Sequence, residues 1–375
     1  MIKENHVLAN GIRENSETNG ILLGGGCPWR QQYQINDSQN SDIFEWSNVG
    51  NLPNPIAYFG AIVTKNRVYL LGGRDEYNVL NTVYTAAINS DGTLDKWITS
   101  DPLPEPLFQS QALVIKNRVY LLGGCGKYCF TNVVYTAPIN DDGTLGKWMI
   151  SDPLPLKIVE DQVIVTKNYV YILGGYTDDR AVTDIYRAPI NRDGTFGVWE
   201  KIGNLPIDLS FSRAIFTKNR IYLLGGYSRY GVMDTVYTAL INSDGILGEW
   251  TNSYSLPDTL FRSRSIVTTN RVYLLGGDSG YEILDTIYTA SINNDGTLGE
   301  WTKNIPLPYP LSNFQAIVTK NHIYILGGLK VTTKNHNYLL DDIRMADKEE
   351  ISSNVIRATF SGGLNDYSQY YNNSM

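Results

Sequence analysis

The sequence predicts an all-β protein, a seven-bladed β-propeller with four antiparallel strands per blade in a closed ring. Gly-Gly pairs end at Gly25, Gly73, Gly124, Gly175, Gly226, Gly277 and Gly328, and the last six are spaced by 51 residues. Tryptophans recur with the same spacing, at Trp46, Trp97, Trp148, Trp199, Trp250 and Trp301. A repeat of about 50 residues cannot bury both faces of its own sheet, so its copies must stack around an axis. Seven Gly-Gly strands therefore predict seven blades.

Each repeat contains four strand signals in a fixed order. In the second repeat, residues 61–64 are rich in β-branched side chains, and Lys65-Asn66 supplies a tight turn. Residues 67–73 are almost continuously apolar, which is typical of a strand buried on both faces. Residues 82–88 form the third strand, and after a turn at residues 89–92 the segment around Trp97 forms the fourth.

The terminal repeats depart from this pattern. We expect residues 1–360 to form one propeller domain, with a longer first turn at residues 11–18 and a longer loop at residues 331–337. No tryptophan lies near position 352, and residues 355–360 are predicted to supply the outer strand of the seventh blade. Residues 361–375 are polar and aperiodic, and we expect a tail that orders only on a partner, as in a larger assembly.

Four-stranded blades place their loops on two faces of the ring. The constant face holds the turns between strands one and two and between strands three and four, which hardly change from repeat to repeat. The variable face holds the loops after each Gly-Gly pair and the links between blades, which differ in every repeat. Divergence confined to one face of duplicated blades favours specific contacts there. The alternative is that these loops are unconstrained surface.

Taken together, the β-branched strand, the aromatic strand ending in Gly-Gly, the Tyr strand and the late Trp resemble a kelch repeat over roughly residues 5–350. The regular ending Asn-x-Asp-Gly-Thr-Leu-Gly-x-Trp is also similar to repeats of bacterial surface and bacteriophage structural proteins. The resemblance implies a propeller. It does not select a function, because the family includes adaptors, adhesins, oxidases and sugar epimerases.

Composition excludes several classes of protein. The net charge of −7 argues against nucleic acid as a partner. The sequence contains no apolar run of 18 residues, so no membrane span is predicted. The N-terminus has no apolar segment typical of a signal peptide. Three cysteines, Cys27, Cys125 and Cys129, do not make a disulfide framework, although Cys125 and Cys129 are spaced for a local bond.

Candidate ligand-binding residues lie on the variable face, where aromatic and Arg side chains contribute most to binding energy. In its loops and at the start of the first strands these are Trp29, Tyr77, Tyr128, Phe211, Tyr230, Arg262 and Tyr281. Near the axis, Glu160 and Asp161 are expected opposite Arg213, Arg262 and Arg264, in a shallow basin suited to a polar ligand such as a glycan. The alternative is that these charges simply neutralise one another.

Other constellations have structural explanations. The periodic Tyr and Trp residues recur in every blade and are expected to pack between blades, with the Tyr hydroxyls bonded. Turn chemistry accounts for Asn-x-Asp-Gly without calcium. The histidines His6, His322 and His336 are too few and badly placed for a zinc or copper site. No cofactor, metal or catalytic motif is predicted.

The sequence therefore favours a non-enzymatic recognition module that contacts a protein or surface glycan through its variable face. The absence of a signal peptide and of any other domain suggests a cytoplasmically assembled particle, such as a virion, as its location. An intracellular kelch scaffold is the rival within the binding class. The alternative from another class is a sugar-active enzyme, of the epimerase or lyase kind, that uses Glu160 or Asp161 with Arg213 and Arg264.

Overall fold

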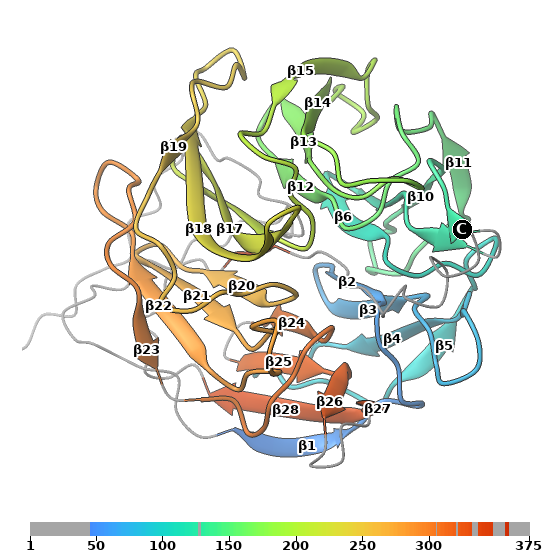
Figure 1. The fold of residues 1–375 in the computed structure, drawn as a ribbon. Helices are drawn as coiled ribbons and strands as arrows, with labels where there is room; N and C mark the ends of the chain where they lie inside the picture. The colour runs from blue at the N-terminus through green and yellow to red at the C-terminus, as the bar shows by residue number, and fades with distance from the viewer. Residues whose placement is uncertain are drawn as a thin grey trace, which may run out of the picture.

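The computed structural model describes residues 46–126, 129–304, 306–319, 322–331, 337–347 and 357–359, and these form six sheets around a central axis (Figure 1). Every sheet contains four antiparallel strands in the order inner, second, third, outer, and one sheet carries an additional strand. Figure 1 shows β2, β6, β12, β20 and β24 close to the axis and β1, β5, β11, β15 and β23 at the perimeter.

Blades 1 to 3 follow one another along the chain. Blade 1 consists of β2 (Gly60–Val63), β3 (Arg67–Leu71), β4 (Val83–Ala87) and β5 (Ile98–Ser100). Blade 2 consists of β6 (Gln111–Ile115), β7 (Arg118–Leu122), β10 (Val134–Pro138) and β11 (Met149–Ser151). Blade 3 consists of β12 (Gln162–Val165), β13 (Tyr169–Leu173), β14 (Asp184–Pro189) and β15 (Glu200–Asn204).

Blades 4 to 6 complete the ring. Blade 4 consists of β16 (Arg213–Thr217), β17 (Arg220–Ser228), β18 (Gly231–Leu240) and β19 (Thr251–Asn252). Blade 5 consists of β20 (Arg264–Val267), β21 (Arg271–Leu275), β22 (Ile287–Ser291) and β23 (Thr302–Asn304). Blade 6 consists of β24 (Gln315–Val318), β25 (His322–Leu326), β28 (Asp342–Asp347) and β1 (Ser47–Asn51).

Two short hairpins extend the variable-face loops. β8 (Cys125–Gly126) pairs with β9 (Cys129–Phe130), and β26 (Leu329–Val331) pairs with β27 (Asn337–Leu339). Both hairpins begin directly after a Gly-Gly pair, where blades 1, 3 and 5 have only isolated bridges. The loops after Gly-Gly therefore differ in backbone structure as well as in sequence.

The prediction of seven blades is wrong, because the structure has six. The described part of the N-terminal repeat is its last strand: β1 follows Trp46 and pairs antiparallel with β28, with Ser47 opposite Met345. The outer position of the last blade is thus filled from the N-terminal side, which explains why no Trp is needed near position 352. The first Gly-Gly pair, at Gly25, lies outside the described residues.

The expected outer strand at residues 355–360 is also wrong. Its described part, β29 (Arg357–Thr359), pairs with the inner strand β20 of blade 5. The long first turn at residues 11–18 and the tail at residues 361–375 lie outside the described residues, so the single domain over residues 1–360 stays a prediction. In the described part of the chain, no helix has the length and apolar character needed to cross a membrane.

Six clusters of buried apolar side chains fill the six joints between neighbouring blades. Each cluster contains or contacts one periodic tryptophan: Trp97 packs with Tyr324 between blades 6 and 1, and Trp46 packs between blades 5 and 6. The other four joints hold Trp148, Trp199, Trp250 and Trp301. The prediction that these residues pack between blades is confirmed.

The Gly-Gly motif has a steric cause. Gly72 and Gly73 have φ angles of +61° and +94°, in the left-handed region that side chains disfavour. A Cβ on Gly72 would lie 2.2 Å from the Leu107 carbonyl oxygen, which belongs to the link into the next blade. Glycine is therefore required where the second strand leaves the sheet against its neighbour.

Candidate functional site

The constant face is occupied by bonds between blades. The Tyr in the second strand of a blade donates a hydroxyl hydrogen bond to the Gly carbonyl in the Asp-Gly turn of the following blade. The donor–acceptor distances are 2.9 Å for Tyr69–Gly143, 2.8 Å for Tyr120–Gly194, 2.8 Å for Tyr171–Gly245, 3.0 Å for Tyr222–Gly296 and 3.1 Å for Tyr324–Gly92. The hydrogen-bond partners expected for these hydroxyls are therefore the Gly carbonyls of the neighbouring turns. The side chains of the constant face thus stabilise the contacts between blades.

The Asp-Gly turns are held by their own side chains. Asp193 accepts hydrogen bonds from the Thr195 backbone N–H at 3.0 Å and from its hydroxyl at 2.7 Å. These bonds lower the pKa of Asp193, and the same pattern recurs at Asp91, Asp142 and Asp295. The turn explanation of Asn-x-Asp-Gly is confirmed, since the Asp stabilises the turn and the Gly carbonyl accepts from the neighbouring blade.

A belt of hydrogen bonds links the inner strands around the axis. Two aligned positions, which we call the axial pair, stand two residues apart where each inner strand begins, and the second of them is the first residue of that strand. The second residues of the six axial pairs, which we call the axial belt, are Gly60, Gln111, Gln162, Arg213, Arg264 and Gln315, of which Gly60 has no side chain. Each side chain bonds the neighbouring blade: Gln111 donates to the Asp161 carbonyl at 3.0 Å, and Gln162 accepts from the Ala214 N–H at 2.8 Å. Arg213 donates to the Ser263 carbonyl, Arg264 to Gln315, and Gln315 to the Phe59 carbonyl.

Gly60 completes the axial belt by close approach rather than by a side chain. A Cβ there would lie 2.8 Å from the Ala112 Cβ of blade 2. Arg213 and Arg264 are each 2 % exposed. These two arginines, predicted to line an open basin, therefore lie inside the ring and hold successive blades together.

The first residues of the axial pairs share an unusual backbone. Tyr58, Gln109, Glu160, Phe211, Arg262 and Asn313 all have φ between +55° and +61°. Because the strained conformation recurs in every blade, it belongs to the scaffold rather than to one functional site. It lets the chain turn into each inner strand, and backbone bonds join adjacent positions, as from the Gln109 N–H to the Tyr58 carbonyl at 2.9 Å.

Two acids of this region are buried. Glu160 and Asp161 are each 1 % exposed. Burial raises the pKa of Asp161 to about 7 and raises that of Glu160 well above its usual range, although Arg262 and Arg264 oppose the rise at Glu160. One oxygen of each carboxyl, Glu160 Oε1 and Asp161 Oδ2, has no hydrogen-bond partner among the described residues. Both acids therefore lie inside the ring, away from open solvent, and Glu160 is the one within electrostatic reach of the arginines.

Arg262 is the axial charge that reaches the surface. Its side chain is 19 % exposed, and its guanidinium lies 3.7 Å from the Asp278 carboxylate. The Phe211 and Phe261 rings flank it, with centroids 5.1 Å and 4.6 Å from Cζ. Sequence reasoning found Phe211 and Arg262 but missed Phe261 and Asp278. The varied loop after Gly277 was the available signal for Asp278.

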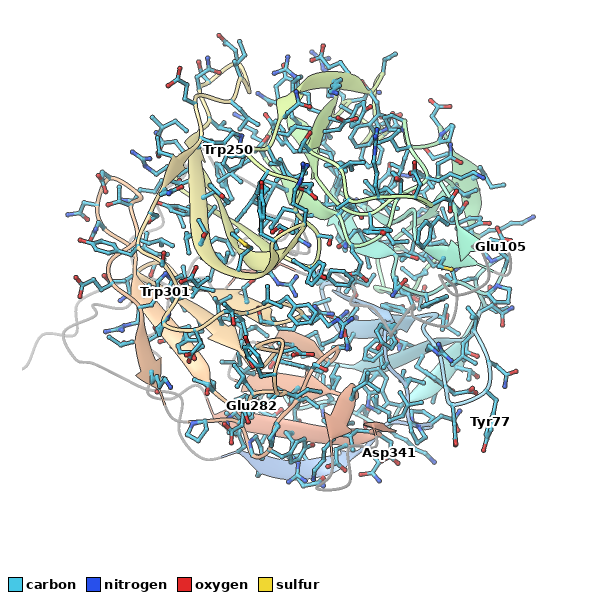
Figure 2. The ribbon with its side chains drawn as sticks, in the orientation of Figure 1. Tyr77, Glu105, Trp250, Glu282, Trp301 and Asp341 are labelled. Carbon is cyan, nitrogen blue, oxygen red and sulfur yellow. The ribbon has the colours of Figure 1, made fainter. Side chains whose placement is uncertain are left out.

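The exposed aromatic residues lie farther out, at the tips of loops. Tyr77, Tyr230 and Tyr281, here called the tip tyrosines, are 81 %, 78 % and 96 % exposed and stand four residues after the Gly-Gly pair. Figure 2 places Tyr77 at the outer edge of the ring. Their loops are held by short-range bonds: Asp75 accepts from the Tyr77 N–H at 2.8 Å, and the Ser228 hydroxyl accepts from the Tyr230 N–H at 3.1 Å.

The predicted site residues thus fall into two groups. Glu160, Asp161, Arg213 and Arg264 are buried at the axis, with Arg262 and Phe211 half-buried beside them, while the tip tyrosines lie on exposed loops. Trp29 and Tyr128 lie outside the described residues, as do Cys27, His6 and His336.

The cysteine and metal predictions concern the same face. The Cys125 thiol is buried and its Sγ donates to the Gly126 carbonyl, whereas the side chain of Cys129 is outside the described residues, so their pairing stays a prediction. His322 begins β25 and its ring contacts Tyr324 edge-on. Within the described ranges, no group of three or more His, Cys, Asp or Glu side chains is arranged to hold a metal ion.

A closed ring of repeated blades, with one face used for its own cohesion and one face varied, defines a β-propeller repeat protein. A profile of the KLHDC2/KLHL20/DRC7 kelch-repeats domain matches residues 17–226, more than half of the chain. The chain therefore belongs to the kelch-repeat family, as the sequence resemblance suggested. Most kelch-repeat proteins are non-enzymatic binding scaffolds.

Similar proteins agree with this assignment. Kelch-like protein terF of Aspergillus terreus is 22 % identical over 335 residues, 83 % of this chain and 69 % of that protein. Kelch repeat and BTB domain-containing protein 1 of Horsepox virus is 25 % identical over 232 residues, 59 % of this chain but 38 % of that protein. The chain spans well under half of that viral relative.

Among solved structures, that of YjhT has the same fold. It superimposes with a TM-score of 0.61 at 14 % identity and covers 83 % of this chain and 99 % of its own. At this identity the likeness concerns the fold alone.

Proposed function

We propose that this chain is a non-enzymatic protein-interaction module whose variable face binds a partner through the tip tyrosines and the neighbouring loops. The observation that carries the proposal is the recurrence of an exposed Tyr at one repeat position in blades 1, 4 and 5. Exposed aromatic side chains on a rigid scaffold are typical of binding surfaces. The constant face supports the proposal by contrast, since its Tyr hydroxyls and turn carbonyls are already bonded within the ring.

The axial residues are proposed to support this face from beneath. Arg262, half-buried between Phe211 and Phe261, is the member placed to contact a bound partner. The buried axial residues proposed to lie beneath the variable face are Glu160, Asp161, Arg213 and Arg264. Trp29 and Tyr128 remain proposed contacts of the variable face. The polar tail at residues 361–375 stays a prediction as a segment for larger assembly.

A triple variant tests the proposal. Tyr77→Ala, Tyr230→Ala and Tyr281→Ala together remove the tip tyrosines, and the matched control replaces three exposed apolar residues elsewhere, Ile150, Val198 and Ile246, by Ala. Tagged wild-type and variant chains capture proteins from an extract of the source cells, quantified by mass spectrometry. We expect the wild type and the control to retain one partner that the tyrosine variant loses. Equal retention by all three proteins would contradict the proposal.

A glycan is the other partner that exposed tyrosine rings can stack against. The same three proteins applied to a glycan array decide this point. Binding to one glycan class that depends on the tip tyrosines, without a captured protein, would replace the protein partner by a glycan. Display on a virion or cell surface stays a prediction, which fractionation of purified particles against cytosol would test.

A sugar-active enzyme is the weaker alternative. It requires Glu160 or Asp161 to reach a substrate, yet both are 1 % exposed and the adjoining arginines are engaged in the axial belt. Turnover on a panel of sugars that Glu160→Gln abolishes, while the unfolding transition stays unchanged, would revive this alternative.

A further inference from the structure

The two faces of the ring differ in charge. Outside the axial residues, the described variable-face loops carry fourteen acidic side chains, Asp75, Glu76, Asp101, Glu105, Asp152, Asp178, Asp179, Asp208, Asp234, Asp258, Asp278, Glu282, Asp285 and Asp341. The same loops carry five basic ones, Arg74, Lys157, Arg180, Arg229 and Lys330. The described constant-face turns are nearly balanced, with nine acidic and seven basic side chains. Among the described loops and turns, the negative charge is therefore concentrated on the variable face.

Most of the basic side chains on the variable face are already engaged within the chain. Arg229 Nε lies 2.6 Å from an Asp208 carboxylate oxygen. Arg74 lies over the Phe108 ring, and Lys330 lies 4.3 Å from the centroid of Tyr309. Lys157 and Arg180 instead border a pocket of about 310 Å³ that also contains Asp178 and Asp179. Among the described residues of this face, few cations are thus free to attract an acidic partner.

Two of the three tip tyrosines, Tyr77 and Tyr281, have a carboxylate next to them in the chain, whereas Tyr230 follows Arg229. Glu76 precedes Tyr77 and raises its pKa, and Glu282 follows Tyr281; all four side chains are exposed. In blade 3, where no tip tyrosine occurs, Asp178 and Asp179 occupy the loop and are both exposed. Figure 2 shows Tyr77, Glu105, Glu282 and Asp341 along the right and lower parts of the ring, away from its centre. An exposed acid and an exposed aromatic ring therefore occur together in blades 1 and 5.

We propose that the partner contacts this face through a basic, Lys- and Arg-rich protein segment. The carboxylates attract such a segment, and the exposed tyrosine rings offer flat surfaces on which guanidinium and ammonium groups stack. An acidic or phosphorylated partner would meet like charge over most of the described loops of this face. This inference rests on the proposed function and specifies the chemistry of its partner.

Charge-removing variants test the inference with a peptide probe. The variable-face variant combines Glu76→Gln, Asp178→Asn, Asp179→Asn and Glu282→Gln. The constant-face control removes the same number of Asp and Glu charges from exposed turns, by Asp95→Asn, Asp141→Asn, Glu249→Gln and Glu300→Gln. The probe is a fluorescein-labelled peptide of alternating Arg and Gly, compared with one of alternating Glu and Gly, and binding is followed by fluorescence polarisation.

We expect the Arg peptide to bind the wild type at low salt and the variable-face variant to bind it about tenfold more weakly, while the control changes by less than about twofold. Binding should also weaken as the screening length falls from ~10 Å at 0.1 M salt to ~3 Å at 1 M. Equal weakening by the two variants would overturn the inference, because attraction would then follow net charge alone. Failure of the Arg peptide to bind better than the Glu peptide would overturn it too.

The captured partner separates this inference from the proposed function. If a partner depends on the tip tyrosines but binds through a segment that is not basic and is insensitive to salt, the proposed function stands and this inference fails. If capture is independent of the tip tyrosines, the proposed function fails first.

Discussion

Removing one hydroxyl between two blades should destabilise the whole ring. Tyr120 is fully buried, and its ring stacks on Phe196 with centroids 4.3 Å apart, a contact that Phe would keep. Its hydroxyl donates to the Gly194 carbonyl of the next blade at 2.8 Å. Tyr120→Phe therefore removes the hydroxyl while keeping the ring, and it leaves a buried carbonyl without this donor. A buried unsatisfied group costs about 1–3 kcal/mol, which is the expected loss in the free energy of unfolding.

Tyr222→Phe provides a matched control in the joint between blades 4 and 5. Its hydroxyl donates to the Gly296 carbonyl at 3.0 Å, but the Thr217 hydroxyl donates to the same oxygen at 2.7 Å. The carbonyl stays bonded in this variant, so only the net value of one hydrogen bond is lost. That loss is about 0.5–1.5 kcal/mol.

Urea unfolding followed by tryptophan fluorescence and by circular dichroism measures both losses. Tyr120→Phe should have the lower midpoint at an unchanged dependence on urea concentration. If Tyr222→Phe is as destabilising as Tyr120→Phe, or if both variants match the wild type, the turn carbonyls do not need these donors and the reasoning is refuted.

Three further changes have definite outcomes. Trp148→Ala should cost about 3–5 kcal/mol of unfolding free energy through a cavity between blades 1 and 2, measured by urea unfolding. Because burial raises the pKa of Asp161 to about 7, native Asp161 keeps its proton after the unfolded chain loses it, so its contribution to stability falls as pH rises from about 4 to 7. Asp161→Asn should therefore gain stability relative to wild type at pH 8 compared with pH 4; a constant difference would contradict this. Ser47→Cys with Met345→Cys should form a disulfide detectable by peptide mass mapping, and its absence under oxidising conditions would contradict closure by β1.

Repetition made much of the fold predictable from sequence. A side chain that makes the same contact in every joint, such as Tyr120 or Trp148, recurs at a fixed spacing, so its role between blades follows from the period. The Asp-Gly turns were predictable for the same reason. Asp193 bonds its own turn, and Gly194 presents the carbonyl that Tyr120 needs.

The number of blades was not predicted correctly because a marker of the second strand was counted. Each Gly-Gly pair marks a second strand, whereas a complete ring requires every sheet to have an outer strand. Trp46 lies 51 residues before Trp97, and no Trp follows Trp301 near position 352. These two facts signal that the N-terminal repeat lends its outer strand to the last blade, where β1 pairs with β28.

The axial residues were identified but their burial was not. Arg213 and Arg264 are residue types that usually face solvent, and their variation between blades suggested an open basin. Closing six blades brings the inner strands together, so these side chains bond the neighbouring blade and become buried. No local sequence signal distinguishes a buried belt from an exposed basin, because the burial results from closure of the ring. The tip tyrosines, which no neighbouring blade covers, were placed correctly on exposed loops.

The central claim is that the variable face is the binding surface. Hydrogen exchange of the chain with and without its captured partner tests it most directly, because every blade reports on both faces in one experiment. The account predicts slower exchange in the loops at residues 74–80, 227–232 and 278–284, with the turns at residues 89–93, 140–144 and 191–195 unchanged. Protection of those turns, with the loops after Gly-Gly unaffected, would contradict it.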